Sequence, residues 1–553
     1  MKLTKITAMV AAIATAAGLG AVTASSASAD VVTDGDKTIT LNATSADQLT
    51  GHTFKVVKVA SYDVYGTAPN QSVTLKTEDA LKTDIADYLK YTGNGDPLAW
   101  AQQQDNAKLD QSTTSPWLGD GTTRNLADKL ASKATEANTP TFGRDNRSAT
   151  FTLTSPGLWL IVDQAATGTS SKALPILAGT PLTINNDKVY SNGQIDMKNQ
   201  TMSVGKTVTD QTVAAGQDAS YKITTTVPNY VGYKVKDYQF TVSDKFTDDA
   251  PLAYKTGTLT VKIGDQTLTQ GTDYTVTGFD PTSKTFTVDL SAYIKAKGFG
   301  TGVLADNSKF TDAGLVGKTV TVEYKATVTG STGNTGAANT PMAKYPNDPT
   351  NNESKQEVPG TPVKVFNFDY TLVKQDKTTG DKLEGAKFAI KNADGKYLAY
   401  TATADGGNKW STLDAKPNAD ATSGVFTTGV GGKVKFPALD EGKYTIEEIA
   451  APTGYVNVGV SFSFTIKANL TGTGADQTAN PTYTIDADST TSDVWHLVSN
   501  GSTAEVVVEN VKSITQLPLT GGAGTVLFTV VAALLIGAGV TVGVRSRKAS
   551  TIA

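Results

Sequence analysis

The chain has 553 residues, which is too long for one compact core and predicts about three domains. Its net charge of −4 arises from 53 acidic and 49 basic residues without a basic stripe, so nucleic acid is excluded as an expected partner. The sequence contains no cysteine, which excludes disulfides and leaves either the cores alone or another crosslink to stabilise the fold. Plentiful Gly and Pro, with recurring Thr and Val, favour strands joined by turns.

The N-terminus, Met1–Ala29, has the pattern of a cleaved secretory signal peptide. Lys2 and Lys5 give a positive start, an uncharged Ala-rich run follows from Ile6, and Ala27-Ser28-Ala29 matches the small-residue cleavage pattern. The alternative is an N-terminal membrane anchor, but the apolar run is short and ends in small and polar residues. We therefore expect the protein to be secreted.

The first region of the secreted part, residues 30–200, mixes two kinds of pattern. Its strand-like stretches are Thr38–Leu41, Thr53–Ala60 and Ala149–Asp163, and its helical stretches lie near Asp79–Lys90 and Asn125–Ala137. We expect a β-sandwich with helical insertions.

The second region, 201–363, and the third region, 364–513, alternate apolar and polar residues with the period of half-buried strands. Thr319–Thr329 and Tyr274–Leu290 show this most clearly, whereas Asn347–Thr361 is polar and is predicted to be a linker. The predicted fold class is therefore all-β, with tandem Ig-like β-sandwich domains in a row.

The last region, 514–553, contains three parts in order. They are Leu517-Pro518-Leu519-Thr520-Gly521, an apolar run of 19 residues at 526–544, and a basic tail with Arg545, Arg547 and Lys548. The apolar run is long enough to span a bilayer as a helix, and the basic tail fits its cytoplasmic side. The ordered set resembles the sortase sorting signal. This resemblance implies that a sortase cysteine attacks the carbonyl of Thr520 and that an amine, from peptidoglycan or from a lysine of another subunit, resolves the thioacyl enzyme.

Two segments of the third region resemble the CnaB-type, SpaA-like pilin domain. They are Asp381–Phe388 and Gly442–Tyr455, and the second is close to the YxLxETxAPxGY "E-box" of that family, with Ile449 in place of the usual Thr. The second region resembles the fimbrial isopeptide-forming D2 domain. The matching segments are Val204–Val208, Ser220–Thr224, Thr241–Phe246, Asn339-Thr340 and Tyr345–Pro349.

Both resemblances imply the same self-made crosslink. In these families a lysine on the first strand, an acid in mid-domain and an asparagine on the last strand meet in the core, and burial favours the neutral amine and the protonated acid. Carried onto this sequence, the third-region residues are Lys374, Glu448 and Asn510, and the second-region residues are Lys206, Asp244 and Asn339. Asn347 is a rival for Asn339, because both lie on the same proposed final strand.

A polymerising pilin also needs an acceptor lysine near the end of its first region, where pilin families carry a YPKN-like motif. The corresponding segment is Ile195–Gln200, in which Lys198-Asn199 agrees with the family and Asp196-Met197 replaces Tyr-Pro. Lys198 is the predicted acceptor, with Lys188 as the nearest rival. Tyr345-Pro346 looks similar, but no lysine follows Pro346.

A wall-anchored chain of this kind could have one of three functions. The first is the shaft subunit of a covalent pilus, whose partners are a sortase, identical subunits, peptidoglycan, tip or minor pilins and a host surface; the second is a monomeric wall-anchored adhesin. An enzyme is not expected, because His52 and His496 have no metal-ligand spacing and the sequence shows no cysteine nucleophile, G-x-S-x-G or phosphate loop. No cofactor or metal is expected. The sequence favours the pilus shaft.

Overall fold

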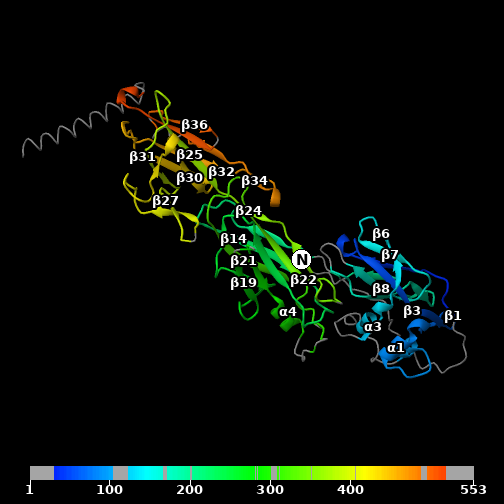
Figure 1. Cartoon of the computed structure of the whole chain (residues 1–553). Helices are drawn as coiled ribbons and strands as arrows, with labels where there is room; N and C mark the ends of the chain where they lie inside the picture. The colour runs from blue at the N-terminus through cyan, green and yellow to red at the C-terminus, as the bar shows by residue number, and fades with distance from the viewer. Residues whose placement is uncertain are drawn as a thin grey trace, which may run out of the picture.

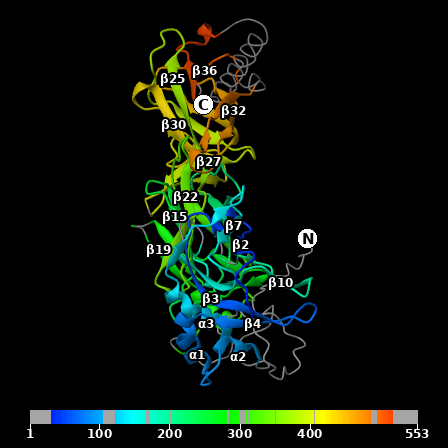
Figure 2. The same ribbon diagram turned by 90° about the vertical axis from the view of Figure 1, so that its right-hand side faces the viewer.

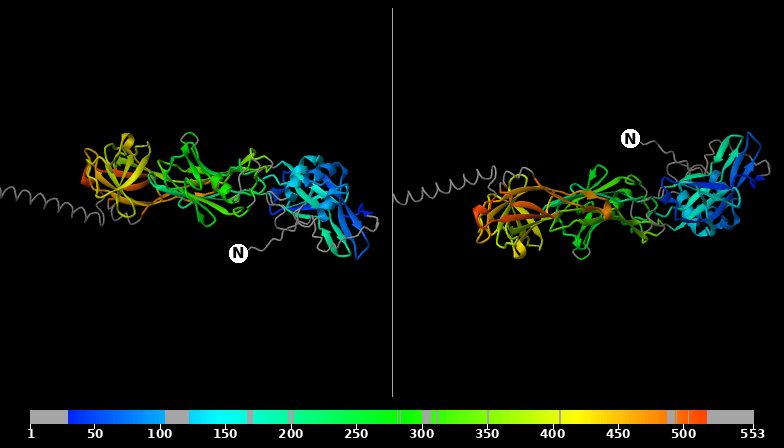
Figure 3. Two further views of the ribbon diagram at one scale, coloured as in Figure 1. Left: turned by 90° about the horizontal axis from the view of Figure 1, so that it is seen from below. Right: turned by 90° about the horizontal axis from the view of Figure 1, so that it is seen from above.

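The computed structural model describes residues 30–103, 122–165, 171–197, 199, 202–280, 282, 284–299, 305, 308–310, 312–349, 351–404, 406–486, 493, 495–502 and 504–517. Three β-rich domains follow one another in a row, from the first domain at the lower right of Figure 1 to the third at the upper left. The two views in Figure 3 show the same elongated arrangement. The predicted signal peptide 1–29, Pro518–Gly521 and the apolar segment 526–544 lie outside the described residues.

In its described residues, the first domain contains strands of 2 to 13 residues and three α-helices. The strands are β1 (Asp30–Val31), β2 (Thr38–Asn42), β3 (Thr53–Tyr65), β4 (Ser72–Thr77), β5 (Glu136–Asn138), β6 (Thr141–Phe142), β7 (Ser148–Thr152), β8 (Leu158–Ala165), β9 (Ile176–Gly179), β10 (Leu182–Ile184), β11 (Lys188–Ser191) and β12 (Gln194–Asp196). The helices are α1 (Lys82–Leu89), α2 (Pro97–Gln103) and α3 (Thr122–Leu130).

One sheet of this domain is built on the path β1-β3-β8-β9, a second has the order β12-β2-β7-β6, and β10 and β11 form a two-stranded sheet. The last strand, β12, pairs in parallel with β2, so the chain leaves the domain beside one of its first strands.

The helices of this domain differ from the prediction in two places. The helix predicted to reach Ala137 ends earlier, because Glu136–Asn138 pairs with β3 as β5, and the helix Pro97–Gln103 was not predicted.

The second domain is a sandwich of two six-stranded sheets. Its elements are β13 (Gly205–Val208), β14 (Asp218–Thr226), β15 (Thr241–Phe246), β16 (Leu252–Tyr254), β17 (Thr260–Ile263), β18 (Gln266–Thr267), β19 (Thr275–Asp280), β20 (Thr285–Asp289), α4 (Ser291–Gly298), β21 (Thr319–Val328), β22 (Ala337–Pro346), β23 (Lys355–Pro359) and β24 (Val363–Val365). One sheet has the path β13-β14-β21-β17-β18 and the other β19-β20-β15-β22-β23. Figure 2 shows β15 and β22 side by side in the middle of the molecule. The alternation predicted over Thr319–Thr329 is confirmed, since every second residue of β21 is buried between the sheets.

The predicted linker Asn347–Thr361 is wrong in its second half. Lys355–Pro359 forms β23, which pairs antiparallel with β22, and β24 then pairs with the start of β22. The polar composition reflects an edge strand, whose outer face and edge both meet water. The second domain therefore extends to Val365, two residues beyond the predicted boundary.

The third domain is a second sandwich. Its strands are β25 (Phe368–Asp376), β26 (Lys387–Lys391), β27 (Tyr397–Ala402), β28 (Asn408–Leu413), β29 (Phe426–Thr427), β30 (Lys433–Leu439), β31 (Gly442–Ala450), β32 (Ser461–Lys467), β33 (Leu470–Thr471), β34 (Thr478–Ala479), β35 (Thr482–Ile485), β36 (Val498–Ser502) and β37 (Glu505–Asn510). The sheet β30-β25-β37-β36 faces the longer sheet β28-β27-β26-β31-β32-β35. Strands β25 and β37, the first and last long strands, are parallel neighbours.

The two joints between domains are built differently. Between the second and third domains, Ala215 donates a backbone hydrogen bond to Ala438 and accepts one from Trp410, so the turn before β14 is hydrogen-bonded directly to strands β30 and β28 of the third domain. Between the first and second domains, the joint includes an ion pair of 3.2 Å from Lys172 to Asp348. None of the helices in the described ranges is long and apolar enough to cross a bilayer.

Candidate functional sites: two buried lysine–acid–asparagine clusters

The second domain brings Lys206, Asp244 and Asn339 together in its core. Lys206 projects from β13, Asp244 from β15 and Asn339 from β22, so the cluster joins the two facing sheets. The amine of Lys206 pairs with Oδ2 of Asp244, and neither side chain has any exposed surface. Nδ2 of Asn339 donates to the same Oδ2 at 3.2 Å. The predicted set of three residues is therefore in contact.

A fourth side chain, Tyr324 of β21, occupies the centre of this cluster. Its hydroxyl accepts hydrogen bonds from Nζ of Lys206 at 2.9 Å and from Nδ2 of Asn339 at 2.8 Å, and it donates to Asp244. Sequence reasoning did not find Tyr324, because its place in an alternating strand marks it only as an inward-facing core residue.

The cluster favours an uncharged amine. Burial lowers the pKa of Lys206 from 10.5 to about 8, against the opposing charge of Asp244. The ring of Tyr221 lies beneath the amine, with its centroid 4.7 Å from Nζ. Oδ1 of Asp244 and Oδ1 of Asn339 are buried without a hydrogen-bond partner among the described residues.

The third domain holds an equivalent cluster of Lys374, Glu448 and Asn510. Lys374 lies on β25 and Asn510 on its parallel neighbour β37, while Glu448 reaches across from β31 of the facing sheet. Nζ of Lys374 is 3.2 Å from Oε1 of Glu448 and donates to the backbone carbonyl of Glu509 at 3.1 Å. The side chains of Lys374 and Glu448 have no exposed surface, and Asn510 is fully buried.

The electrostatics of this second cluster are similar. Burial lowers the pKa of Lys374 from 10.5 to about 8, and burial raises the pKa of Glu448 against the effect of Lys374. The side-chain amide of Asn510 also interacts with the Glu448 carboxylate and, like Lys374, acts against the effect of burial on its pKa. The polar atoms of the Asn510 side chain are buried, so the three side chains form one group from which water is excluded.

The chemistry open to such a cluster is amide formation. A neutral lysine is a nucleophile, a protonated carboxylic acid can polarise the asparagine carbonyl, and the fold holds both against the target. Because water is excluded, these groups meet without competing hydrolysis.

The rival asparagine lies elsewhere. Asn347 follows β22 and faces the first domain, where its carbonyl accepts a hydrogen bond from the backbone of Lys172. Its side chain accepts a hydrogen bond from Ser354 and donates one to Gln356. Asn339, not Asn347, is therefore the asparagine that contacts Lys206.

Lys198, the predicted acceptor, lies outside the described residues, but both of its neighbours are anchored. Met197 donates its backbone N–H to Asn42 and is 7% exposed. Asn199 is buried, and its Nδ2 donates to the carbonyls of Gln48 at 2.8 Å and Ser171 at 3.2 Å. The rival Lys188 opens β11, and its side chain is not among those described.

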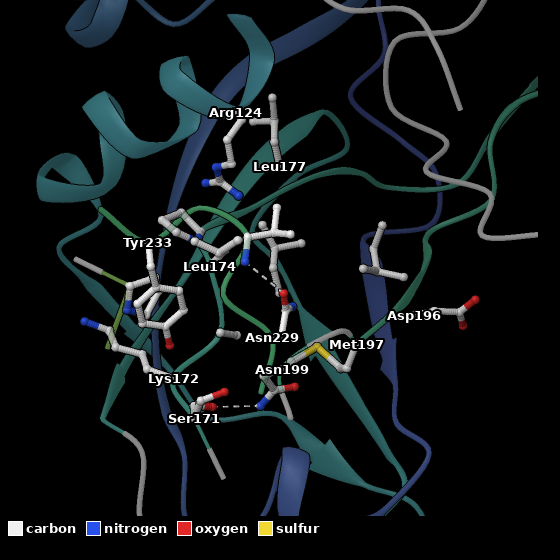
Figure 4. A pocket seen from close by; sticks show the side chains of 16 residues that line it. Arg124, Ser171, Lys172, Leu174, Leu177, Asp196, Met197, Asn199, Asn229 and Tyr233 are labelled. Atoms are coloured by element: carbon white, nitrogen blue, oxygen red, sulfur yellow. Dashed lines mark hydrogen bonds between the residues drawn. The ribbon is translucent and has the colours of Figure 1, made fainter. Parts of the chain in front are cut away.

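A mainly apolar cavity lies at the joint of the first and second domains (Figure 4). Met197 and Asn199 both line it, together with Leu174 of the first domain and Tyr233 of the second.

The two histidines take no part in either cluster. His52 is buried and pairs with Asp163 at 2.6 Å, while His496 is exposed and follows Asp493, whose carbonyl accepts its backbone N–H. Within the ranges that the structure describes, no three His, Asp or Glu side chains are grouped to hold a metal ion.

Leu517, the first residue of the predicted sorting motif, belongs to the buried core of the third domain and is 3% exposed. It follows a short helical turn, Ile514–Gln516, capped by Ser513. The side chain of Gln516 accepts hydrogen bonds from the backbone of Lys512 and Ser513 and donates one to Thr378 at 3.1 Å. The start of the motif is thus held against the domain.

Comparison with known proteins identifies two segments of the chain. Residues 368–479 match the SpaA family, described as a prealbumin-like fold domain, and residues 509–550 match the LPXTG cell wall anchor motif. No curated protein sequence matches the chain.

Solved structures similar to the chain include three pilus proteins. The T6 backbone pilin of serotype M6 Streptococcus pyogenes is 15% identical, with 87% of this chain and 100% of that chain covered and a TM-score of 0.49. The full-length major pilin SpaD from Corynebacterium diphtheriae is 18% identical, with coverages of 88% and 99% and a TM-score of 0.44. The group B streptococcus pilus 2b backbone protein is 25% identical, with coverages of 56% and 99% and a TM-score of 0.35.

The assignment rests on the two family matches, which agree with the predicted third domain and with the predicted sorting signal. The chain is a secreted surface protein that carries a SpaA-type prealbumin-like domain and is anchored to the cell wall through an LPXTG motif.

Proposed function

We propose that the protein is the repeating shaft subunit of a covalently polymerised pilus. The observation that carries this proposal is the pair of fully buried lysine–acid–asparagine clusters in consecutive domains. A buried lysine beside a buried acid is expensive to fold, so two such clusters favour a covalent purpose over a structural one. The anchor motif supports display on the cell surface.

Each cluster closes an amide within the subunit. Lys206 attacks Asn339 with Asp244 as the promoting acid, and Lys374 attacks Asn510 with Glu448 in the same role. Each reaction releases one ammonia and takes place once per molecule, so it belongs to maturation and not to enzymatic turnover.

A third amide joins subunits. A sortase transfers the acyl group of Thr520 to Nζ of Lys198 on the next subunit, and the last acyl transfer goes to peptidoglycan. The neighbours of Lys198 support this choice, because hydrogen bonds of Met197 and Asn199 hold the chain on both sides of that position. Tip or minor pilins and a host surface are further proposed partners.

Intact mass of a recombinant fragment from Asp30 to Leu517 tests the two internal amides. The fragment includes Leu517 because that side chain is part of the third-domain core. We expect a mass lower than the sequence mass by two ammonias. Asp244→Ala and Glu448→Ala should each restore one of them, and an unchanged sequence mass would contradict the proposal.

A monomeric wall-anchored adhesin is the alternative, and it would contain the same domains. Only a working acceptor lysine separates the two functions. Co-expression with a pilus-type sortase distinguishes them: a ladder of covalent multimers supports the shaft, and single anchored chains support the adhesin.

A further inference from the structure

The hydroxyl of Tyr324 contacts both nitrogen atoms between which the second-domain reaction must move a proton. It lies 2.9 Å from Nζ of Lys206, the attacking atom, and 2.8 Å from Nδ2 of Asn339, the leaving atom. It also donates to Asp244. Tyr324 is 2% exposed, so water has little access to the same position.

Among the described residues, no hydroxyl contacts the third-domain cluster. The aromatic group near its amine is Phe388, whose ring centroid is 5.7 Å from Nζ of Lys374. Besides Glu448, that amine contacts the backbone carbonyl of Glu509. The phenol hydroxyl is therefore a chemical difference between the two clusters of the same chain.

We propose that Tyr324 is a catalytic residue of the second-domain crosslink, which relays a proton from Asp244 to the departing nitrogen of Asn339. This inference rests on the proposed Lys206–Asn339 amide. It assigns the proton transfer in that reaction to a specific side chain, the phenol of Tyr324, which has no counterpart among the described residues of the third-domain cluster.

The ammonium of Lys206 first gives one proton to Asp244, and the neutral amine then attacks Cγ of Asn339, so that the Nζ–Cγ bond forms and negative charge moves to Oδ1. Asp244 passes its proton to the hydroxyl of Tyr324, which passes its own to Nδ2. The Cγ–Nδ2 bond breaks with release of ammonia, and Asp244 takes the surplus proton from the new amide nitrogen.

The surroundings of Tyr324 suit a neutral relay. Burial, followed by the nearby charge of Asp244, raises the pKa of Tyr324 well above 10, so the phenol keeps its proton at physiological pH. A phenol that stays protonated can accept one proton and donate another in the same step.

The substitution Tyr324→Phe removes the hydroxyl and keeps the ring, which stacks on Tyr221 at 5.2 Å and packs edge-on against Phe286 at 4.8 Å. Tyr238→Phe is the matched control. Tyr238 is a buried tyrosine of the same core, its hydroxyl has no hydrogen-bond partner in the described part of the chain, and its ring packs edge-on against Phe310 at 5.0 Å.

The experiment follows both crosslinks in the same molecule over time. The full-length chain is produced in a pulse in cells without sortase, denatured at intervals and digested, and the crosslinked peptides are quantified by mass spectrometry. The rate of formation of the Lys374–Asn510 peptide serves as the internal reference. We expect Tyr324→Phe to slow formation of the Lys206–Asn339 peptide by about 10²-fold or more, as for loss of a general acid, with the third-domain peptide unchanged.

Tyr238→Phe should leave both rates unchanged. Equal second-domain rates in the unaltered chain and in Tyr324→Phe would overturn the role of Tyr324 while leaving the crosslink itself intact. Absence of the second-domain peptide from the unaltered chain would instead overturn the proposed crosslink and the relay together.

A measurement without substitution covers the case in which Tyr324→Phe fails to fold. In heavy water, the unaltered chain should show a larger slowing of the second-domain crosslink than of the third-domain crosslink, because the relay moves more than one proton in the rate-limiting step. Equal slowing of the two crosslinks would contradict the relay.

Discussion

Asn510 lies two residues further along β37 than Val508, the backbone partner of Lys374 on the parallel neighbour β25. The side chains that we propose to join are thus on adjacent strands of one sheet. In the second domain, by contrast, Lys206 and Asn339 belong to opposite sheets of the sandwich. The same reaction would therefore join two adjacent inner strands of one sheet in the third domain and the two facing sheets in the second.

Removing the third-domain crosslink should lower the free energy of unfolding of that domain by about 4–5 kcal/mol. This magnitude follows from the chain-entropy argument for a crosslink that closes a loop of more than a hundred residues. Asn510→Ala removes the amide acceptor, and urea unfolding of the variant measures the loss. Asn500→Ala, an exposed asparagine on the adjacent strand β36, should change the stability by less than about 0.5 kcal/mol.

The chain without the crosslink should also become more stable as the pH rises from about 8 to 10.5. In Asn510→Ala the amine of Lys374 is retained, and burial lowers its pKa from 10.5 to about 8. Between these two values the unfolded chain binds a proton that the folded chain has released, so the free energy of unfolding increases with pH. The crosslinked lysine is an amide and has no such titration.

Urea unfolding at several pH values checks this expectation as a difference between the two chains. Tyrosines that titrate near pH 10 contribute to both chains and cancel in the difference. A constant difference across the range would contradict a buried amine at Lys374.

Lys198→Ala should abolish covalent polymerisation and leave anchored monomers. The backbone on both sides of this position is fixed by Met197 and Asn199, which favours a defined acceptor over any nearby lysine. Co-expression with a pilus-type sortase and denaturing gels of the wall fraction give the result. Lys188→Ala is the control, and a ladder that is lost only in that variant would transfer the acceptor role to Lys188.

Gln516→Ala should accelerate the acyl-transfer step of the sortase. Leu517 must leave the third-domain core before an extended motif can enter an enzyme cleft, and the side chain of Gln516 holds the preceding turn through three hydrogen bonds. The variant changes no residue of the motif. Rates of thioacyl formation with purified sortase test this, and an unchanged rate would show that release of the turn does not limit the reaction.

The sequence supported the third-domain cluster well, because the segment around Glu448 is a family motif and the two flanking strands have clear alternation. In the second domain, Asn339 and Asn347 lie near opposite ends of the same strand, and only the pairing of Phe246 with Asn339 decides between them. No pattern in a single chain encodes that register. Tyr324 was missed for a related reason, since the position of its hydroxyl depends on strands more than a hundred residues apart.

The edge strands of the second domain also escaped prediction, and they have a mechanical consequence. Once the amides form, a pulling force that enters at Lys206 can pass directly to Asn339, and one that enters at Lys374 can pass directly to Asn510. Only a few residues follow Asn510 before the motif, but 26 residues, 340–365, follow Asn339 up to the end of β24. They include β23 and β24, which lie outside the loop that the crosslink closes and are held by hydrogen bonds to β22 and by burial of Val358 and Val365. Released and extended at about 3.4 Å per residue, this segment would lengthen each subunit by roughly 90 Å before the covalent bonds stop it. In a fibre of such subunits, the crosslinked parts of each domain would resist extension. The segment that follows Asn339 would be the part of every subunit that extends under a sudden load.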